Sequence, residues 1–590
     1  MSTISFRRHA LAATGLTGIM FALACSGTMN HPAPDLAAPV STPATTKVWV
    51  TGDLHNHTYL TDGSHTETEV FQNALDTFGL DWIANSEHGG AYGRDLDGTT
   101  WSTLLPLGDT ANSSNTRTRS DTSMWRWQSL RDFSWPLLFG GTDGAGAVHA
   151  GLQASYPSKV IIQGVEWNVP SHEHGSVGIV GVSSGKAVAD FEYMFDGSEK
   201  DRSRDSGIRT TYNTAAGTTP ITASNPAEVD LFGNALSVKR STHADAVAAI
   251  AYLQKNFSTT AYFAMNHPSR KLAYNVEHIR DFINAGPGVV IGLEGFPGHQ
   301  REAYRGGYSS GPYYWNATTR TVSTSSSNGT DVTYKARTYG GADYMLAKTG
   351  GVMDALWGEG RRFWVFVNSD FHYYADGADF WPGQYAKTYL KAAAKTPKEV
   401  VAAMKTGSTY IVHGDLINAL DFNASTGNGI TGDDTSLIKT MGEELTVSSG
   451  GNVKITVRFK SPAANNNSEA PVVDHVDIIA GEVSPKAEAG TTAYFLDTNS
   501  TTQVLVRLMS SEFKTGSDGY HYATFTLSNV TKSMYFRLRG TNQTLAGGRL
   551  DTTTGDPLMD EVDTVSGTNT TAKAWADLWF YTNPIFIKVN

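Results

Sequence analysis

The sequence is poor in cysteine, in long apolar runs and in excess positive charge. Cys25 is the only cysteine among 590 residues, so the chain cannot form an internal disulfide or a site of several thiolates. Only the stretch from Leu11 to Ala24 is mainly apolar over such a length, and it is too short to span a bilayer comfortably. The net charge of -11 argues against tight binding to nucleic acid, which needs a basic surface. We therefore expect no nucleic-acid partner.

The first 46 residues have the composition of an export signal followed by a linker. Arg7 and Arg8 precede the apolar run, which ends in small residues, as in a signal peptide over residues 1–25. Cys25 follows Ala-Leu-Ala and resembles the lipidated cysteine of bacterial lipoproteins, although ordinary secretion with cleavage is the alternative. Residues 26–46 are rich in Pro, Ala, Ser and Thr and predict a linker. We expect a bacterial periplasmic protein or outer-membrane lipoprotein, with the membrane contacted only through Cys25.

From residue 47 to about residue 432, short apolar runs alternate with stretches of helical periodicity. The predicted strands cover residues 47–52, 80–84, 159–165, 261–265, 289–293, 363–367 and 409–412. The predicted helices cover residues 66–78, 244–256, 277–285 and 342–357, with another that begins at Thr396. Seven such units predict an α/β fold in which parallel strands close into a distorted seven-stranded (β/α)7 TIM-like barrel. Its functional groups should lie at the carboxyl ends of the strands.

The pattern changes after about residue 433. Short strands of alternating polarity are separated by Asn, Gly, Ser and Thr, which predicts an antiparallel β-sandwich over residues 433–590. We interpret this part as an accessory domain, with binding of a surface polymer as a weaker option. Three long insertions, at residues 89–155, 185–240 and 298–340, either shape the pocket or decorate the surface.

Nine histidines and acids, most of them directly after a predicted strand, form a candidate ligand set. They are His55, His57, Asp62, His88, Glu166, His174, His267, Asp370 and His372. Imidazole and carboxylate ligands without thiolate favour Zn, Mn or Fe. Nine ligands are enough for two or three divalent ions, with one carboxylate as a bridge. Adjacent ions lower the pKa of bound water and supply a bridging hydroxide near neutral pH.

Other residues near these strand ends are candidates for catalysis. Arg270 could hold an anionic group of the substrate or be an ordinary surface arginine. Glu294 and His299 could act as a general acid or could orient a metal ligand. His172 competes with His174 for one ligand position, and we favour His174 because an apolar run follows it. We expect Glu87 to orient a histidine.

Several segments resemble the motifs of the PHP (polymerase and histidinol phosphatase) metallohydrolases. They are residues 53–63, 80–88, 164–166 with His174, 266–268 and 368–372. The second motif departs from the usual Thr-Asp-His, because Ser86, Glu87 and His88 stand there. The resemblance covers about residues 47–420. It implies a distorted seven-stranded barrel, a trinuclear metal site and hydrolysis of phosphoesters.

Within this family the chain looks most like the exported carbaryl-hydrolase (CehA/McbA-like) branch. The pieces that suggest this are residues 164–168, 292–295, 409–412 and 583–585. That branch includes hydrolysis of carbamates or carboxylic esters, so the expected substrate is a small-molecule ester of either kind. A non-catalytic protein that binds a surface polymer is a third hypothesis. The sequence gives neither the oligomeric state nor the identity of the substrate or the metals.

Overall fold

The computed structural model describes residues 47–90, 153–198, 230–426, 438–560 and 570–590, apart from a few short gaps. These gaps are at residues 60, 182–183, 231, 233, 235–236, 309–310 and 376–377. The predicted signal peptide, Cys25 and the linker lie outside the described residues, as does much of the first two insertions. No described helix is long and apolar enough to cross a membrane.

Seven strands form the part of the main sheet that carries the predicted ligands, in the order β12–β6–β5–β4–β3–β2–β1. Their bounds are β1 Val48–Asp53, β2 Trp82–Asn85, β3 Val160–Asn168, β4 His174–Ile179, β5 Ala261–Met265, β6 Val290–Phe296 and β12 Trp364–Val367. Strands β1, β2 and β3 are parallel to one another, and so are β5, β6 and β12. Their side chains are almost all buried, as expected of a parallel sheet covered by helices.

The sheet is mixed rather than all parallel, which corrects the arrangement predicted from the sequence. Strand β4 is antiparallel to both β3 and β5, because the turn between β3 and β4 is too short for a crossover helix. Next to β1 the sheet continues with β13 (Ala386–Ala392), β14 (Thr409–His413) and β24 (Trp579–Thr582), each antiparallel to its neighbour. The sequence reading placed no strand at β13.

The free edge of β12 is tied to β13 by side chains. The Thr388 hydroxyl accepts a hydrogen bond from the Val367 N–H at 2.9 Å and donates one to the Val367 carbonyl at 2.8 Å. The Asn583 side-chain oxygen accepts from the Val365 N–H at 2.9 Å. Among the described residues, no backbone ladder joins β12 to β13. The sheet therefore curls back on itself, as in a barrel. At the seam, the free edge of β12, two polar side chains make the hydrogen bonds that a backbone ladder would otherwise make.

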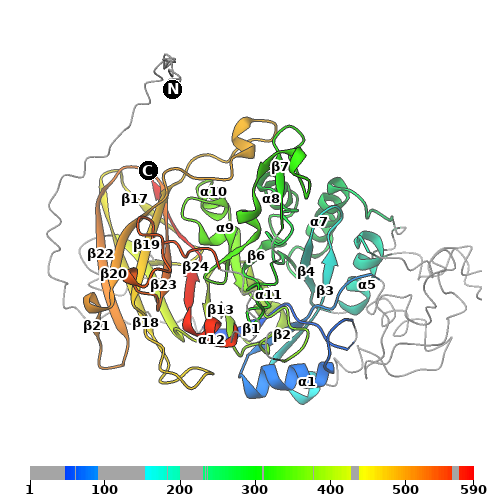
Figure 1. Cartoon of the computed structure of the whole chain (residues 1–590), viewed down its shortest axis with the longest axis horizontal. Coiled ribbons are helices and arrows are strands. Elements are labelled where there is room, and N and C mark those ends of the chain that lie inside the picture. Colours follow the sequence, from blue (N-terminus) through cyan, green and yellow to red (C-terminus); the bar gives the residue numbers. More distant parts are fainter. Residues whose placement is uncertain are drawn as a thin grey trace, which may run out of the picture. The chain divides into compact units, whose positions relative to one another are not determined.

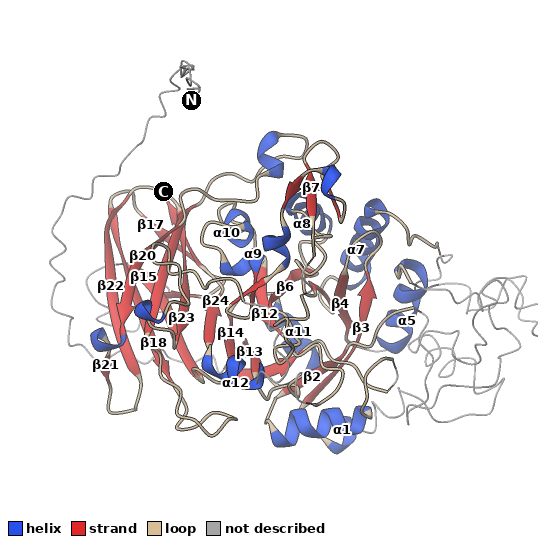
Figure 2. Cartoon of the chain, in the orientation of Figure 1, coloured by secondary structure: helices blue, strands red, loops and turns tan. Residues whose placement is uncertain are grey.

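Helices cover the parallel strands (Figure 2). They are α1 Glu67–Gln72, which continues as a π-helical turn over Asn73–Thr77, α5 Ser184–Phe195, α7 His243–Phe257, α8 Val276–Ala285, α9 Tyr344–Ala347, α10 Val352–Trp357, α11 Pro397–Met404 and α12 Thr570–Ala576. The Thr66 hydroxyl caps α1 by accepting from the Glu69 N–H at 3.1 Å, as predicted. The single helix predicted over residues 342–357 is split, because Gly350 has a φ of +79° that ends helical geometry between α9 and α10.

Antiparallel strands dominate the later part of the chain, as predicted (Figure 1). One sheet has the order β16 (Ile438–Thr440), β15 (Ala419–Thr426), β18 (Gly451–Lys460), β22 (His521–Val530) and β21 (Lys514–Thr515). The main sheet continues past β24 through β23 (Met534–Thr541), β19 (His475–Glu482) and β20 (Gln503–Met509), and β25 (Ile585–Val589) joins β23 to β17 (Glu444–Val447). Both sheets contribute to one buried apolar cluster.

The third predicted insertion, residues 298–340, has a small fold of its own. Its strands are β7 Tyr314–Asn316, β8 Thr321–Ser323 and β9 Thr330–Asp331, and the short pair β10 Thr338–Tyr339 and β11 Ala342–Asp343 follows. The hydroxyl of Tyr313 lies 3.5 Å from the carbonyl oxygen of Arg270. This insertion therefore reaches the segment that follows β5 and carries two predicted site residues.

Candidate metal centre

Two predicted ligand motifs lie side by side at the carboxyl ends of β1 and β12. Asn56 forms a parallel bridge with Phe371. The His57 N–H donates to the Phe371 carbonyl at 2.7 Å, and the Asp370 N–H donates to the His55 carbonyl at 2.9 Å. This short pairing brings together residues more than three hundred positions apart in the chain.

Asp53 fixes the two motifs to each other. Its buried carboxylate accepts from the His55 N–H at 2.9 Å and from the Ser369 N–H at 2.7 Å. Burial raises the pKa of Asp53 to about 7, although both N–H groups favour the charged form. The sequence analysis assigned no role to Asp53, which opens the first motif and precedes His55 by two residues.

Glu166 is the centre of the site and is almost completely buried in β3. Its Oε1 atom lies 3.0 Å from His55 Nε2 and 3.0 Å from His174 Nδ1, and its Oε2 atom lies 2.8 Å from His88 Nδ1. His267 Nε2 is 3.3 Å from Oε1, and His57 Nε2 is 3.4 Å from Oε2. The two oxygens of one carboxylate thus face two different sets of imidazoles.

Two further acids complete the arrangement. Asp370 Oδ1 lies 3.0 Å from His55 Nε2 and 3.3 Å from His57 Nε2. Asp62 Oδ2 lies 3.3 Å from His88 Nε2, and its Oδ1 lies 3.4 Å from His372 Nε2. Each acid therefore faces at least two of the predicted imidazole ligands.

All nine predicted ligands enter at least one group whose nitrogen and oxygen atoms lie within 4.8 Å of one another. The groups are His57, Asp62, His88 and His372; His55, Glu166 and His267; His55, His57 and Asp370; His88, Glu166 and His174; and Glu173, His174 and His267. The structure therefore brings the predicted residues together from six separate stretches of the chain. Glu173 is a further candidate that the sequence analysis missed.

Several of these side-chain atoms are buried close to other ligand atoms and yet make no hydrogen bond of good geometry. They are His57 Nδ1, Asp62 Oδ1, Glu166 Oε2, His174 Nδ1 and His267 Nδ1. Buried polar atoms normally have a partner, because an unsatisfied group keeps its full desolvation cost. A cation would satisfy these atoms, and the imidazole and carboxylate donor set suits a divalent ion.

The lowered pKa values of two of these histidines also suit cations. Burial, with His372 and His88 nearby, lowers the pKa of His57 to about 3, and burial beside Arg270 lowers that of His267 to about 4. Neutral imidazoles of this kind have a lone pair for a metal. Burial opposes charge on His55 too, but Asp370, Glu166 and Glu294 together raise its pKa well above the usual value. In the chain alone a proton on His55 balances these acids, and a divalent ion would balance them better.

Glu294 and His299, both predicted as candidate catalytic groups, occupy different positions. Glu294 is fully buried in β6, where its Oε1 lies 2.7 Å from His55 Nδ1 and its Oε2 accepts from the His267 N–H at 2.7 Å. It orients two predicted ligands and does not line the cavity. His299 does line the cavity, with Nε2 2.9 Å from Asp370 Oδ2 and Nδ1 2.7 Å from Asp379 Oδ1.

A cavity of about 340 Å³ opens beside the ligand groups. Arg270, His299, Glu302 and Tyr373 line it together with several predicted ligands. One nitrogen of the Arg270 guanidinium lies 3.6 Å from Asp370 Oδ2, and the other lies 3.2 Å from Glu173 Oε1. Tyr373 is 45% exposed, so the cavity is open to solvent on that side.

Glu87 and His172 do not have the roles that the sequence suggested for them. Glu87 accepts from the hydroxyls of Thr58 and Thr61, so it holds the loop that leads to Asp62 instead of orienting a histidine. His172 lies away from the cavity, with Nε2 2.9 Å from His243 Nδ1. His174, and not His172, therefore lies in the groups that could hold a metal ion.

Three residues of the site were missed by sequence reasoning, namely Asp53, Glu173 and Asp379. Glu173 adjoins a predicted ligand, and this adjacency is the only signal that could have drawn attention to it. The Asp379 carboxylate accepts from the His372 N–H at 2.7 Å in addition to its contact with His299. It lies in a loop between β12 and β13, where no sequence pattern marks it.

No protein-family model and no curated protein matches this chain. Among the solved structures that match is a two-domain protein from Bacteroides vulgatus, described as containing a predicted PHP-like metal-dependent phosphoesterase. The two are 10% identical, the match covers 90% of this chain and 99% of that one, and the TM-score is 0.31.

Proposed function

We propose that this protein is a metal-dependent hydrolase that holds two or three divalent ions and cleaves a phosphoester. The observation that carries the proposal is the convergence of six imidazoles and three acids around the two oxygens of Glu166. Without a cation, several buried nitrogens and oxygens of this cluster make no hydrogen bond of good geometry.

The overlap of the groups supports more than one ion. Glu166 belongs to a group with His55 and His267 and also to a group with His88 and His174. A carboxylate shared in this way suits a bridge between neighbouring ions. Zn, Mn and Fe all accept this donor set, because each binds both imidazole and carboxylate.

Divalent ions bound here would polarise the bond to be cleaved and lower the pKa of water near it. The chain's own residues would orient the substrate. The Arg270 guanidinium, held by Glu173, faces the cavity and can bind an anionic oxygen. His299, held by Asp379, is placed to donate a proton to the leaving oxygen. The phenol of Tyr373 lies at the cavity wall, where it can contact the leaving group.

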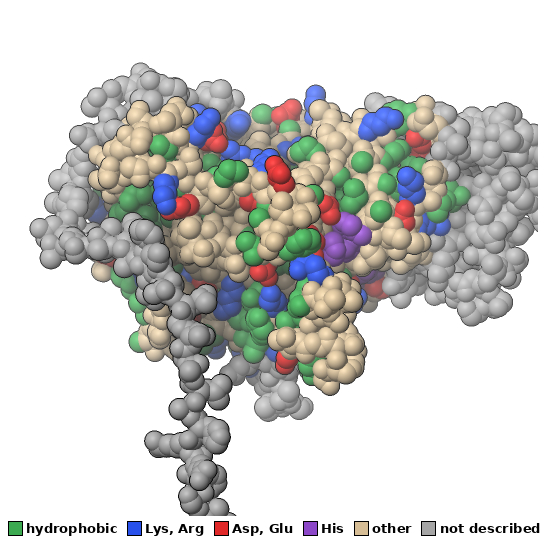
Figure 3. All heavy atoms as spheres, turned by 90° about the horizontal axis from the view of Figure 1, so that it is seen from above, with side chains coloured by type: hydrophobic (Ala, Val, Ile, Leu, Met, Phe, Trp, Pro, Cys, Tyr) green, Lys and Arg blue, Asp and Glu red, His purple; other side chains and the backbone are tan. Residues whose placement is uncertain are grey.

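The surface supports a small ester as the substrate. On the face drawn in Figure 3, basic and acidic side chains are interspersed, and the residues drawn in colour show no continuous basic stripe there. The net charge of -11 likewise argues against a nucleic-acid substrate. Export and a lipid anchor at Cys25 remain predictions.

The test combines metal analysis with a substrate panel. Full-length protein loaded in turn with Zn, Mn and Fe is assayed on nitrophenyl phosphate, bis-nitrophenyl phosphate, nitrophenyl acetate and a naphthyl carbamate. We expect phosphoester cleavage that chelation abolishes, and loss of both metal and activity in Asp370→Ala. Asp421→Ala, which removes an acid from the five-stranded antiparallel sheet, is the matched control and should retain both.

The outcomes separate the alternatives. Wild-type activity that survives exhaustive metal removal would reject the metal-dependent mechanism. Cleavage of only the acetate or the carbamate would assign the site to carbonyl substrates, as in the carbaryl-hydrolase branch. A fully metallated sample that is inactive on the whole panel would favour a non-catalytic binding protein.

A further inference from the structure

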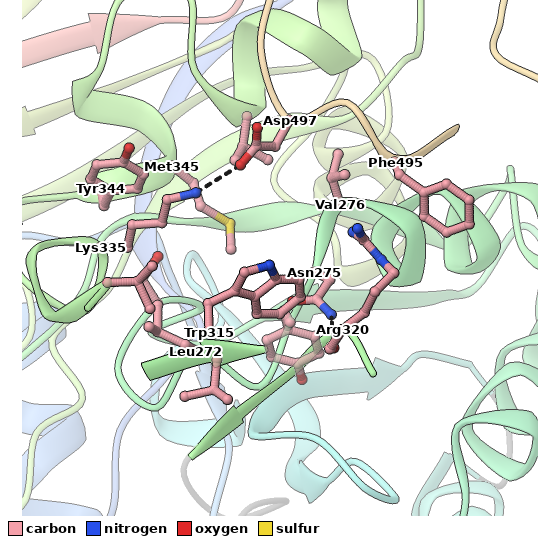
Figure 4. Close-up of a pocket in the computed structure, with 15 residues that line it drawn as sticks. Leu272, Asn275, Val276, Trp315, Arg320, Lys335, Tyr344, Met345, Phe495 and Asp497 are labelled. Carbon is pink, nitrogen blue, oxygen red and sulfur yellow. Dashed lines mark hydrogen bonds and ion pairs between the residues drawn. The ribbon is translucent and has the colours of Figure 1, made fainter. Parts of the chain in front are cut away.

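A second cavity, of about 300 Å³, lies outside the candidate metal centre (Figure 4). Four parts of the chain build it: the loop after β5, the insertion with β7 to β9, helix α9 and the segment around residues 495–497. The side chains that decide its chemistry are Trp315, Arg320, Lys335, Tyr344, Phe495 and Asp497. The volume is at the lower end for ligand pockets, so it suits one small ring rather than a polymer chain.

Every charge around this cavity is already paired. The Nε and Nη2 atoms of Arg320 donate to the two carboxylate oxygens of Glu277, at 2.6 and 2.8 Å. Lys335 Nζ lies 2.9 Å from Asp497 Oδ2. An anionic ligand would have to compete with these carboxylates, and a cationic ligand would meet two cations. The cavity therefore favours a ligand without net charge.

The same pairs leave hydrogen-bonding capacity for a neutral polar ligand. An ammonium has three N–H donors, and one donor of Lys335 reaches Asp497. The Lys335 and Asp497 side chains are 30% and 41% exposed, so a ligand in the cavity can reach both. A donor and an acceptor side by side match a ligand hydroxyl, which both accepts and donates.

Aromatic and apolar surface forms the rest of the wall. The Arg320 guanidinium lies 5.3 Å from the ring centroid of Trp315 and 4.5 Å from that of Phe495. Val276 and Met345 add buried apolar surface. Phe495 is 38% exposed, so part of its ring is open to a ligand. The faces of such rings are negative and attract C–H groups that neighbouring oxygens have made positive.

We propose that this cavity binds one neutral sugar ring. A sugar has an apolar C–H face for the aromatic wall and hydroxyls at its rim for the Lys335–Asp497 pair. A purely apolar ligand would remove water from this pair without replacing the hydrogen bonds that the water made, which is costly. The proposal goes beyond the hydrolase function and stands without it.

The backbone connects the sugar cavity to the candidate metal centre. Ser269 and Leu272 line the sugar cavity, and Arg270 between them lines the metal cavity. Asp343 accepts from the Ser269 hydroxyl at 2.8 Å and caps α9, which begins at Tyr344. A bound sugar therefore contacts the elements that hold Arg270.

The test measures binding rather than turnover. Full-length protein is titrated with glucose, galactose, mannose and N-acetylglucosamine, with detection by saturation-transfer NMR and calorimetry. A single small ring should bind with a dissociation constant on the order of 1 mM. Trp315→Ala removes the aromatic wall, and Asp497→Asn alters the polar rim with little risk to folding. Tyr520→Ala is the matched control, because Tyr520 also stacks with an arginine, Arg458, 3.6 Å from its ring centroid.

We expect at least one sugar to bind, and both cavity variants to weaken its binding about tenfold or more while Tyr520→Ala does not. Absence of binding for every sugar at tens of millimolar would overturn the proposal. Binding that neither Trp315→Ala nor Asp497→Asn weakens would place the sugar elsewhere and would also overturn it. Because the assay needs no catalysis, its result is independent of the hydrolase proposal.

Discussion

Glu294→Gln is the sharpest single test of how the metal centre is built. Three donors converge on this carboxylate: His55 Nδ1 at 2.7 Å, the His267 N–H at 2.7 Å and Asn368 Nδ2 at 3.0 Å. Glutamine keeps the shape but replaces one oxygen by an NH₂ donor. In either orientation of the amide, at least one of these three donors then faces another donor.

The expected loss of metal affinity follows from this contact between two donors. Loss of a partner that orients a metal ligand typically weakens metal affinity by about 10- to 100-fold, or roughly 1.4 to 2.8 kcal/mol. Competition with a chromogenic chelator measures this affinity directly. Activity at limiting metal should fall by a similar factor, and excess metal should restore most of it, because Glu294 does not line the cavity.

A second variant, at another buried glutamate, is the control for Glu294→Gln. Glu359→Gln removes a buried carboxylate bound to Arg280 and Arg361, so it should lower stability and leave metal affinity unchanged. If Glu294→Gln instead keeps its metal affinity and loses turnover at saturating metal, Glu294 is a general acid. In that case the orienting role is refuted.

Two predictions concern stability. Arg537→Met removes the two hydrogen bonds of 2.8 Å that Arg537 donates to the fully buried Asp354, so the free energy of unfolding in urea titrations should fall by about 3 to 5 kcal/mol. Adding Asp354→Leu to the same chain should recover part of this loss. An unchanged free energy of unfolding in Arg537→Met would contradict the prediction. Burial, with His278 and His243 nearby, lowers the pKa of His172 to about 3, so folding keeps this ring neutral while the unfolded chain takes up a proton below about pH 6.5. The free energy of unfolding should therefore fall as the pH drops from about 6.5 toward 3, and His172 should account for about 2 kcal/mol of this loss at pH 5. His172→Phe, measured without metal, should lose stability less steeply with falling pH. Parallel curves of stability against pH for the two proteins would exclude the effect.

The strands and the ligands they carry could be predicted from local pattern, whereas their mutual arrangement could not. Ala261–Met265 is strand β5 with the predicted bounds, and His267 follows it as expected. The direction of β4 depends on the length of one turn, and β13 alternates apolar residues with Lys and Thr too weakly to be recognised. Asp53, Glu173 and Asp379 act through contacts with distant residues or backbone N–H groups, so local pattern does not give their roles, although Asp53 opens the first motif and Glu173 adjoins a predicted ligand.

The seam at β12 has a consequence for biosynthesis. Asn583, which satisfies the Val365 backbone N–H, is made 218 residues after its partner. While the ribosome adds those residues, Thr388 alone of the two side chains can tie the edge of the strand that leads to Asp370 and His372, and the Val365 N–H still lacks Asn583. A nascent chain or a truncated product can therefore hold all nine ligands and still lack the rigid frame that positions them. Pulse-labelled chains that end before residue 579 should accordingly be far more protease-sensitive than the complete chain.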